Sequence, residues 1–150
     1  MQSLVALLSV LILSGWQLPA SAALTIEITE GLEGALPIAV VPFGWTGTTA
    51  ASTPQQVGEI VAADLQRSGR FQTLYPADMM SRPTSGESVD FRDWRALRME
   101  NLVVGSVSSN GPGGYLVRFQ LFDVYRGEQI IGYNIPTTKR DLRATAHHIA

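Results

Sequence analysis

The sequence has no cysteine, one lysine and two histidines. Without cysteine there is no disulfide framework, no thiol redox chemistry and no residue to acylate as in a lipoprotein signal. The net charge of −2 argues against nucleic-acid binding. No basic side chain precedes Arg67, whereas the acidic side chains Glu27, Glu30, Glu33, Glu59 and Asp64 all come before it. This asymmetry indicates either a solvated acidic face or a preference for a basic partner.

Catalytic motifs are also missing. The sequence contains no nucleophile elbow, no zinc-binding HExxH and no phosphate-binding GxxxxGK. His147 and His148 are adjacent and would point about 100° apart on a helix, so they are expected to be ordinary helix residues and not a metal pair. Asp64 lies at the edge of an apolar helix stripe, where a structural hydrogen bond to a loop is the preferred interpretation over catalysis. The sequence therefore predicts no enzyme activity, no cofactor and no metal.

Only one long apolar run occurs, from Leu4 to Leu13. It is too short to cross a bilayer as a stop-transfer helix. A small-x-small pattern, Ala20-Ser21-Ala22, follows it and suits cleavage before Ala23. We therefore expect residues 1–22 to be a secretory signal peptide.

The segment after this site, residues 23–36, is predicted to be an arm and its hinge. Leu24, Ile26 and Ile28 alternate with polar residues, as in a half-buried strand. Gly31 and Gly34 follow and permit unusual backbone angles. Such an arm is suited to adding itself to a sheet edge in a partner, or it pairs with the sheet of its own domain. A third possibility is an inert edge strand.

Residues 37–150 are predicted to form an α/β domain. The pattern indicates strands at 38–43, 71–75, 102–107, 115–125 and 129–135 and helices at 53–68, at 90–98 and from 138 onward. The continuous apolar run at 38–43 predicts a strand buried on both faces. Gly69 is expected to end the first helix and Asp90 to cap the second. The first strand–helix–strand unit predicts parallel strands, and the later strands predict an antiparallel meander across the 110–114 turn. The mixed sheet is therefore expected to be packed by two main helices. The last helix meets no stop signal, so we expect a fragment truncated in that helix.

Several segments together resemble the N-terminal domain of the TolB family of the Tol-Pal system. They are LTIEITEG at 24–31, PIAVVPF at 37–43 and IVAADLQRSGRF at 60–71, followed by VVG at 103–105 and the 115–122 strand with its hairpin. The resemblance covers essentially all of residues 23–150. It implies a two-layer α/β domain that in the family precedes a six-bladed β-propeller, which is missing here.

The resemblance also implies a role. The family acts in the periplasm of Gram-negative bacteria, where it maintains outer-membrane integrity and aids constriction in cell division. Its arm binds the C-terminal domain of TolA, and its propeller carries the main surface for the lipoprotein Pal. Carried over, TolA docking falls on Ala23, Leu24, Thr25, Ile26, Glu27, Ile28, Thr29, Glu30 and Gly31. The alternative hypothesis is a soluble periplasmic α/β ligand-binding or hydrolase domain.

Overall fold

The computed structural model describes residues 34–47 and 53–150. Its strands are β1 (Leu36–Val40), β2 (Gly44–Thr46), β3 (Phe71–Thr73), β4 (Asn101–Ser109), β5 (Gly114–Asp123) and β6 (Glu128–Thr138). Its α-helices are α2 (Thr53–Arg67), α3 (Phe91–Ala96) and α4 (Leu142–Ile149), with 3₁₀ turns η1 (Pro76–Asp78) and η2 (Gly86–Ser88). The predicted signal peptide and the proposed arm residues 23–31 lie outside the described residues.

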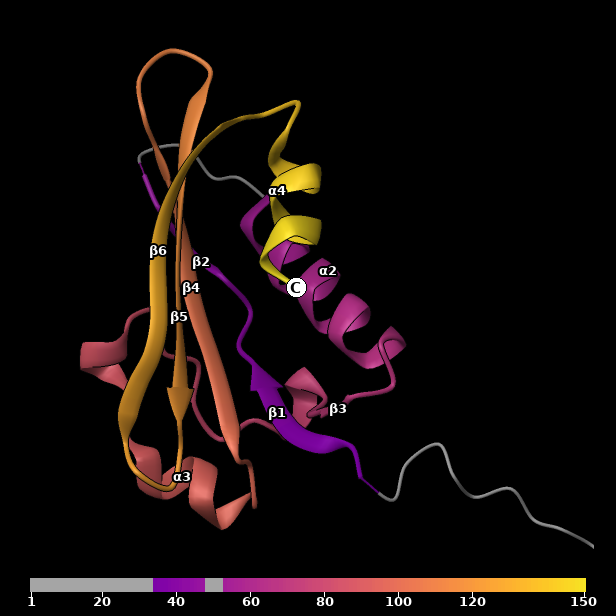
Figure 1. Cartoon of the computed structure of the whole chain (residues 1–150). Coiled ribbons are helices and arrows are strands. Elements are labelled where there is room, and N and C mark those ends of the chain that lie inside the picture. The colour runs from indigo at the N-terminus through magenta and orange to yellow at the C-terminus, as the bar shows by residue number, and fades with distance from the viewer. Residues whose placement is uncertain (1–33, 48–52) are drawn as a thin grey trace, which may run out of the picture.

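The strands form one mixed sheet, as predicted, but it has six strands where five were expected. Their order is β3-β1-β4-β5-β6, with β2 beside β4. β1 runs parallel to both β3 and β4, because the chain crosses over through α2 and later through α3. β4, β5 and β6 are antiparallel, which confirms the meander. The architecture is α/β (Figure 1).

Helix α2 ends where the sequence predicted. Gly69 follows it with φ of +71°, a left-handed conformation that favours glycine. The N–H of Gly69 donates to the carbonyl of Gln66, and the hydroxyl of Ser68 donates to the carbonyl of Leu65 at 2.6 Å. These bonds satisfy carbonyls at the end of the helix. The chain then turns directly into β3.

The main core lies between the sheet and the pair α2 and α4, which Figure 1 shows together on one face. The sheet contributes alternate side chains and each helix contributes one stripe. The buried members are Ile38, Val40, Phe43, Val57, Val61, Leu65, Val103, Val107, Val117, Phe119, Leu142 and Ala146. The two main helices thus pack as expected.

A second core occupies the opposite face, under α3 and the segment that leads to it. Trp94 is fully buried at its centre. Around it lie Ala39, Val41, Met79, Met99, Leu102, Val104, Phe122 and Val124. Since Ile38 and Ala39 enter different cores, β1 is buried on both faces, as its continuous apolar run predicted.

Several predicted boundaries were wrong. Residues 44–46, expected in a loop, form β2, because β4 extends far enough to pair with them. The strand expected at 71–75 ends at Thr73, and the helix expected at 90–98 ends at Ala96. The last helix begins at Leu142 and not near Thr138, since Thr138 still pairs with Gly114 at the end of β6.

Candidate functional site

The arm predicted to bind a partner, residues 23–31, and the predicted cleavage residues Ala20, Ala22 and Ala23 lie outside the described residues. The structure does describe the point where the chain enters the domain. β1 starts at Leu36, whose N–H donates to the carbonyl of Arg70 and whose side chain is 44% exposed. Leu36 pairs with Phe71 of β3. The arm therefore joins the domain beside the short edge of the sheet.

An apolar groove of about 330 Å³ opens at this end of the helix-covered face. It crosses the sheet from β3 to β6 and is covered by the C-terminal half of α2 and the end of α4. Its lining residues are Leu36, Ile38, Val61, Leu65, Phe71, Asn101, Val103, Phe119, Leu121, Ile131, Ile149 and Ala150. Tyr133, 60% exposed, packs against Phe119 next to the groove, with ring centroids 5.8 Å apart and ring planes tilted by 40°. The lining is almost entirely hydrocarbon, so the groove suits apolar side chains and not acid–base chemistry.

The open edges of the sheet differ in how well they could accept another strand. β3 presents only three residues. β2, which pairs only with β4, also has three residues. β6 is long, and its outward backbone groups lack a donor only near its end. The N–H of Asn110 donates to the carbonyl of Gly114, and the N–H of Val124 donates to the carbonyl of Glu100. With the strand register, these two bonds show that the even-numbered residues of β5 direct their backbone groups toward β4. By alternation, Pro136 then faces away from β5 and offers the open edge no N–H.

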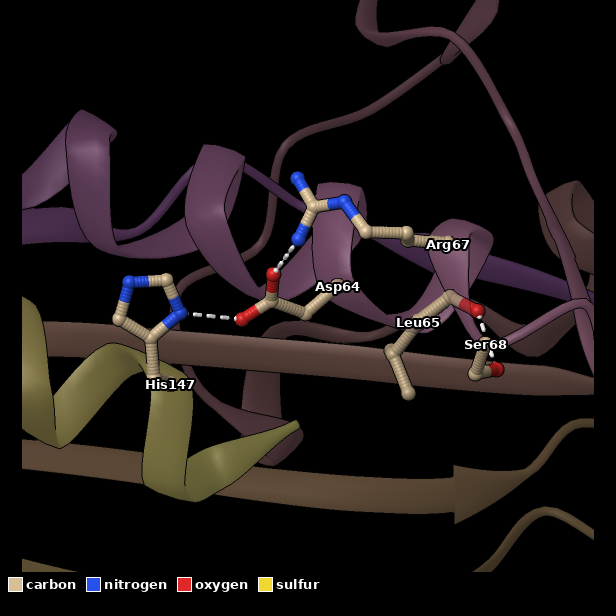
Figure 2. Close-up of polar contacts among 5 residues, drawn as sticks. All are labelled: Asp64, Leu65, Arg67, Ser68 and His147. Atoms are coloured by element: carbon tan, nitrogen blue, oxygen red, sulfur yellow. Dashed lines mark hydrogen bonds and ion pairs between the residues drawn. The ribbon is translucent and has the colours of Figure 1, made fainter.

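A polar cluster joins α2 to α4 on the outside of the main core (Figure 2). Asp64 of α2 accepts from Arg67, one turn along the same helix, at 2.5 Å on Oδ1. Its other oxygen, Oδ2, is bonded to Nδ1 of His147 on α4. The Asp64 side chain is 18% exposed and that of His147 is 46% exposed. One carboxylate thus bridges two helices.

The pKa of Asp64 is lowered from its usual 3.8, first by the hydrogen bond from His147 and then by that from Arg67, against a desolvation cost. The carboxylate is therefore ionised at neutral pH and can only accept, which makes His147 Nδ1 the donor. The expected bond from Asp64 to a loop was wrong, because the partners lie on helices. His147, expected to be an ordinary helix residue, makes a hydrogen bond to a neighbouring helix. The prediction that His147 and His148 do not form a metal pair stays untested.

A second cluster caps α3. The Asp90 carboxylate accepts from the backbone N–H of Arg92 at 3.0 Å and from its guanidinium at 2.7 Å. These two bonds from Arg92, the side-chain one larger, lower the pKa of Asp90 to about 2. Asp90 raises the pKa of Arg92 in return. The predicted role of Asp90 as a helix cap is confirmed.

Within the part of the chain that the structure describes, no group of three or more His, Cys, Asp or Glu side chains is placed to hold a metal ion. None of the helices described there is long and apolar enough to cross a membrane. Met79 packs in the second core, whereas its neighbour Met80 is more than half exposed. The turn at 110–114 joins β4 to β5, with positive φ at Gly111 and Gly113, and so is a hairpin turn as predicted.

Residues 24–130 match the family described as the TolB amino-terminal domain. The chain belongs to the TolB family. It is 46% identical over 130 residues to the Tol-Pal system protein TolB of Thioalkalivibrio sulfidiphilus and 50% identical over 129 residues to that of Nitrosococcus oceani. These matches cover 87% and 86% of this chain but 30% and 29% of the relatives. The chain thus spans about 30% of the length of these TolB relatives.

Solved structures agree on the fold. The crystal structure of TolB from Acinetobacter baumannii superposes with a TM-score of 0.59 at 23% identity, over 77% of this chain and 26% of that one. The LpoB C-terminal domain from Escherichia coli superposes with a TM-score of 0.54 at 14% identity, over 71% and 84% of the two chains. The architecture is therefore that of the TolB amino-terminal domain, and it also occurs outside the TolB family.

Sequence reasoning missed two features of this region, the groove and the Asp64–His147 bond. A partial signal for the bond was present, since Asp64 is a charged residue at the edge of an apolar stripe and His147 sits on a predicted helix. The sequence carried no such signal for the groove, because the residues that line it come from β1, β3, β4, β5 and β6 and from two helices.

Proposed function

We propose that this TolB-family chain is a non-enzymatic interaction component of the Tol-Pal system. After removal of residues 1–22 it acts in the periplasm, where it contributes to outer-membrane integrity and to constriction during cell division. Its arm, residues 23–31, docks on the C-terminal domain of TolA. Pal is bound mainly by a propeller that this sequence does not include. The observation that carries the proposal is the TolB family match, which begins at residue 24 and so includes the arm.

The edges of the described sheet limit where the arm could pair within its own domain. The arm's alternating segment is seven residues long. β3 offers three residues to a new strand, and Pro136 leaves a missing donor in the exposed edge of β6. Within the described sheet, only the part of β6 ahead of Pro136 is as long as the arm segment. The proposal takes the alternative, a sheet edge in a partner.

Apolar and polar residues alternate along the arm, and this pattern determines which contacts docking would make. In strand addition the main chain supplies hydrogen bonds, each worth about 0.5–1.5 kcal/mol net. Side chains on one face enter pockets of the partner, and here they are Leu24, Ile26 and Ile28. Glu27 and Glu30 add negative charge, which favours a partner with a basic rim and speeds association at low ionic strength.

Deletion of residues 24–29 tests the proposal. The buried residues of both described cores all follow the arm in the sequence, so urea unfolding of the deletion variant should keep its midpoint. Titration calorimetry against the TolA C-terminal domain should show binding by the intact secreted chain and none by the deletion variant. Unchanged affinity would contradict the proposal, as would turnover of a substrate by the isolated chain.

A further inference from the structure

The hairpin turn between β4 and β5 contains an asparagine followed by a glycine, Asn110 and Gly111. Both residues are exposed, at the end of the sheet that is drawn in orange at the top of Figure 1. Gly111 has φ of +76°, and no atom of the described residues lies within 4 Å of the place that a Cβ would take on it. Solvent therefore reaches the peptide bond that joins the two residues.

The groups that would react with each other in this turn are not held by hydrogen bonds. Among the hydrogen bonds of residues 34–47 and 53–150, none uses the N–H of Gly111 as its donor and none involves the side-chain amide of Asn110. The turn is closed instead by its backbone, because the N–H of Asn110 donates to the carbonyl of Gly114 at 2.9 Å. Glycine has no side chain to shield its nitrogen, and its backbone rotates over a wide range. The Gly111 nitrogen can therefore approach the side-chain carbon of Asn110.

We propose that Asn110 is a site of spontaneous deamidation, at which the chain modifies itself through a succinimide. The Gly111 nitrogen attacks Cγ of Asn110, the new N–Cγ bond closes a five-membered ring, and the Cγ–Nδ2 bond breaks. The proton of the Gly111 N–H leaves with the side-chain NH₂ group as ammonia. Water then opens either of the two ring bonds to the Gly111 nitrogen, which gives an ordinary aspartate or an isoaspartate. The proposal does not depend on TolA docking by the arm.

The other asparagines of the chain, Asn101 and Asn134, lie in the sheet and serve as internal controls. They are followed by the branched residues Leu102 and Ile135. In the strand register, the backbone N–H groups of Leu102 and Ile135 both point at β5, within the ladder of hydrogen bonds. The side chain of Asn134 also accepts from the guanidinium of Arg118 at 2.9 Å. The strands must therefore open before either control can react.

The isoaspartyl product loosens the turn. Its main chain passes through Cγ, so the ring that the bond from the Asn110 N–H to the Gly114 carbonyl closes gains one backbone atom. That bond is therefore weakened. The change stays at the tip of the hairpin, because Val107 and Val117, a few residues away on the two strands, are fully buried and pair with each other.

Incubation of the whole chain at mildly alkaline pH, followed by trypsin digestion and mass spectrometry, measures the reaction. Cleavage after Arg98 and Arg118 leaves Asn101 and Asn110 in one peptide, so fragment ions compare the site with a control in the same molecule. Conversion at Asn110 should be at least about tenfold faster than at Asn101 or Asn134. An isoaspartyl methyltransferase should label the product.

Two matched variants place the label. Asn110→Gln should remove it, because glutamine would have to close a six-membered ring, which forms far more slowly. Asn134→Gln makes the same change at an asparagine in the sheet and should leave the labelling as in the wild type. Loss of the label in Asn134→Gln, or its persistence in Asn110→Gln, would overturn the assignment.

Hydrogen exchange tests the effect on the turn, since chromatography resolves the isoaspartyl peptide from the aspartyl and unconverted ones. Protection of the amides at residues 109–115 should fall by at least about threefold in the isoaspartyl form, whereas the amides of Val107 and Val117 should keep theirs. The proposal is overturned if Asn110 converts no faster than the two controls, if the converted chain holds no isoaspartate, or if protection across the turn is unchanged.

Discussion

His147 on α4 donates a hydrogen bond to Asp64 on α2 across 83 positions in the sequence. The bond brings one histidine and one carboxylate together at the seam between the two helices that cover the main core (Figure 2). Arg67 completes the carboxylate's partners from its own helix. At the surface, polar side chains therefore join the two helices, and beneath the surface apolar side chains pack between them.

Gly105 should tolerate no side chain. It lies in the middle of β4, and a Cβ there would overlap the ring of Phe43 and come within 2.8 Å of the backbone oxygen of Arg118. Gly105→Ala should lower the free energy of unfolding by about 1–3 kcal/mol through overpacking. Urea denaturation followed by tryptophan fluorescence measures this.

Gly34→Ala is the matched control for that substitution, since no atom of the residues that the structure describes lies within 4 Å of a Cβ at Gly34. Its unfolding free energy should stay within about 0.5 kcal/mol of wild type. Equal destabilisation by the two alanines would contradict the packing account of Gly105.

The cap of α3 should give a pH-dependent contribution to stability. The pKa of Asp90 is lowered from 3.8 to about 2, mainly by its bonds to Arg92. The carboxylate therefore stabilises the fold fully above 3.8, and this contribution is lost as the pH falls toward about 2. Asp90→Asn keeps a capping oxygen but not the charge. Its deficit in unfolding free energy against wild type should be constant near neutral pH and should shrink steadily as the pH falls from 3.8 through about 2.

Asp78→Asn changes the net charge equally, on an exposed 3₁₀ turn. It is the control for Asp90→Asn in urea titrations at several pH values. A deficit for Asp90→Asn that persists unchanged at the acid end would show that the charge of Asp90 does not support the cap.

Local signals in the sequence predicted those parts of the fold that depend on neighbouring residues. The apolar run at 38–43 predicted a strand buried on both faces, and Gly69 predicted the end of α2. Asp90 predicted its own cap, because capping uses a side chain and a backbone N–H only two residues apart. In each case, the interaction that decides the structure lies close by in the sequence.

Features that depend on distant partners were missed. β2 is three residues long and exists because β4 continues past β1 to pair with it. Thr138 and Asp141 do bond to each other as a helix start would require, but Thr138 belongs to β6, so the helix begins only at Leu142. The Asp64–His147 bond requires α2 and α4 to be adjacent, which no local pattern specifies.

The arm is the centre of the functional account, and a pair of substitutions on its two faces tests it most directly. Ile26→Asp places a charge on the face proposed to enter pockets of TolA, whereas Thr25→Asp places the same charge on the opposite face. Calorimetric titration of each secreted chain with the TolA C-terminal domain should show at least about a tenfold loss of affinity for Ile26→Asp, the scale of one buried apolar side chain, and little change for Thr25→Asp. Equal affinities for the two variants would contradict docking of the arm as a strand.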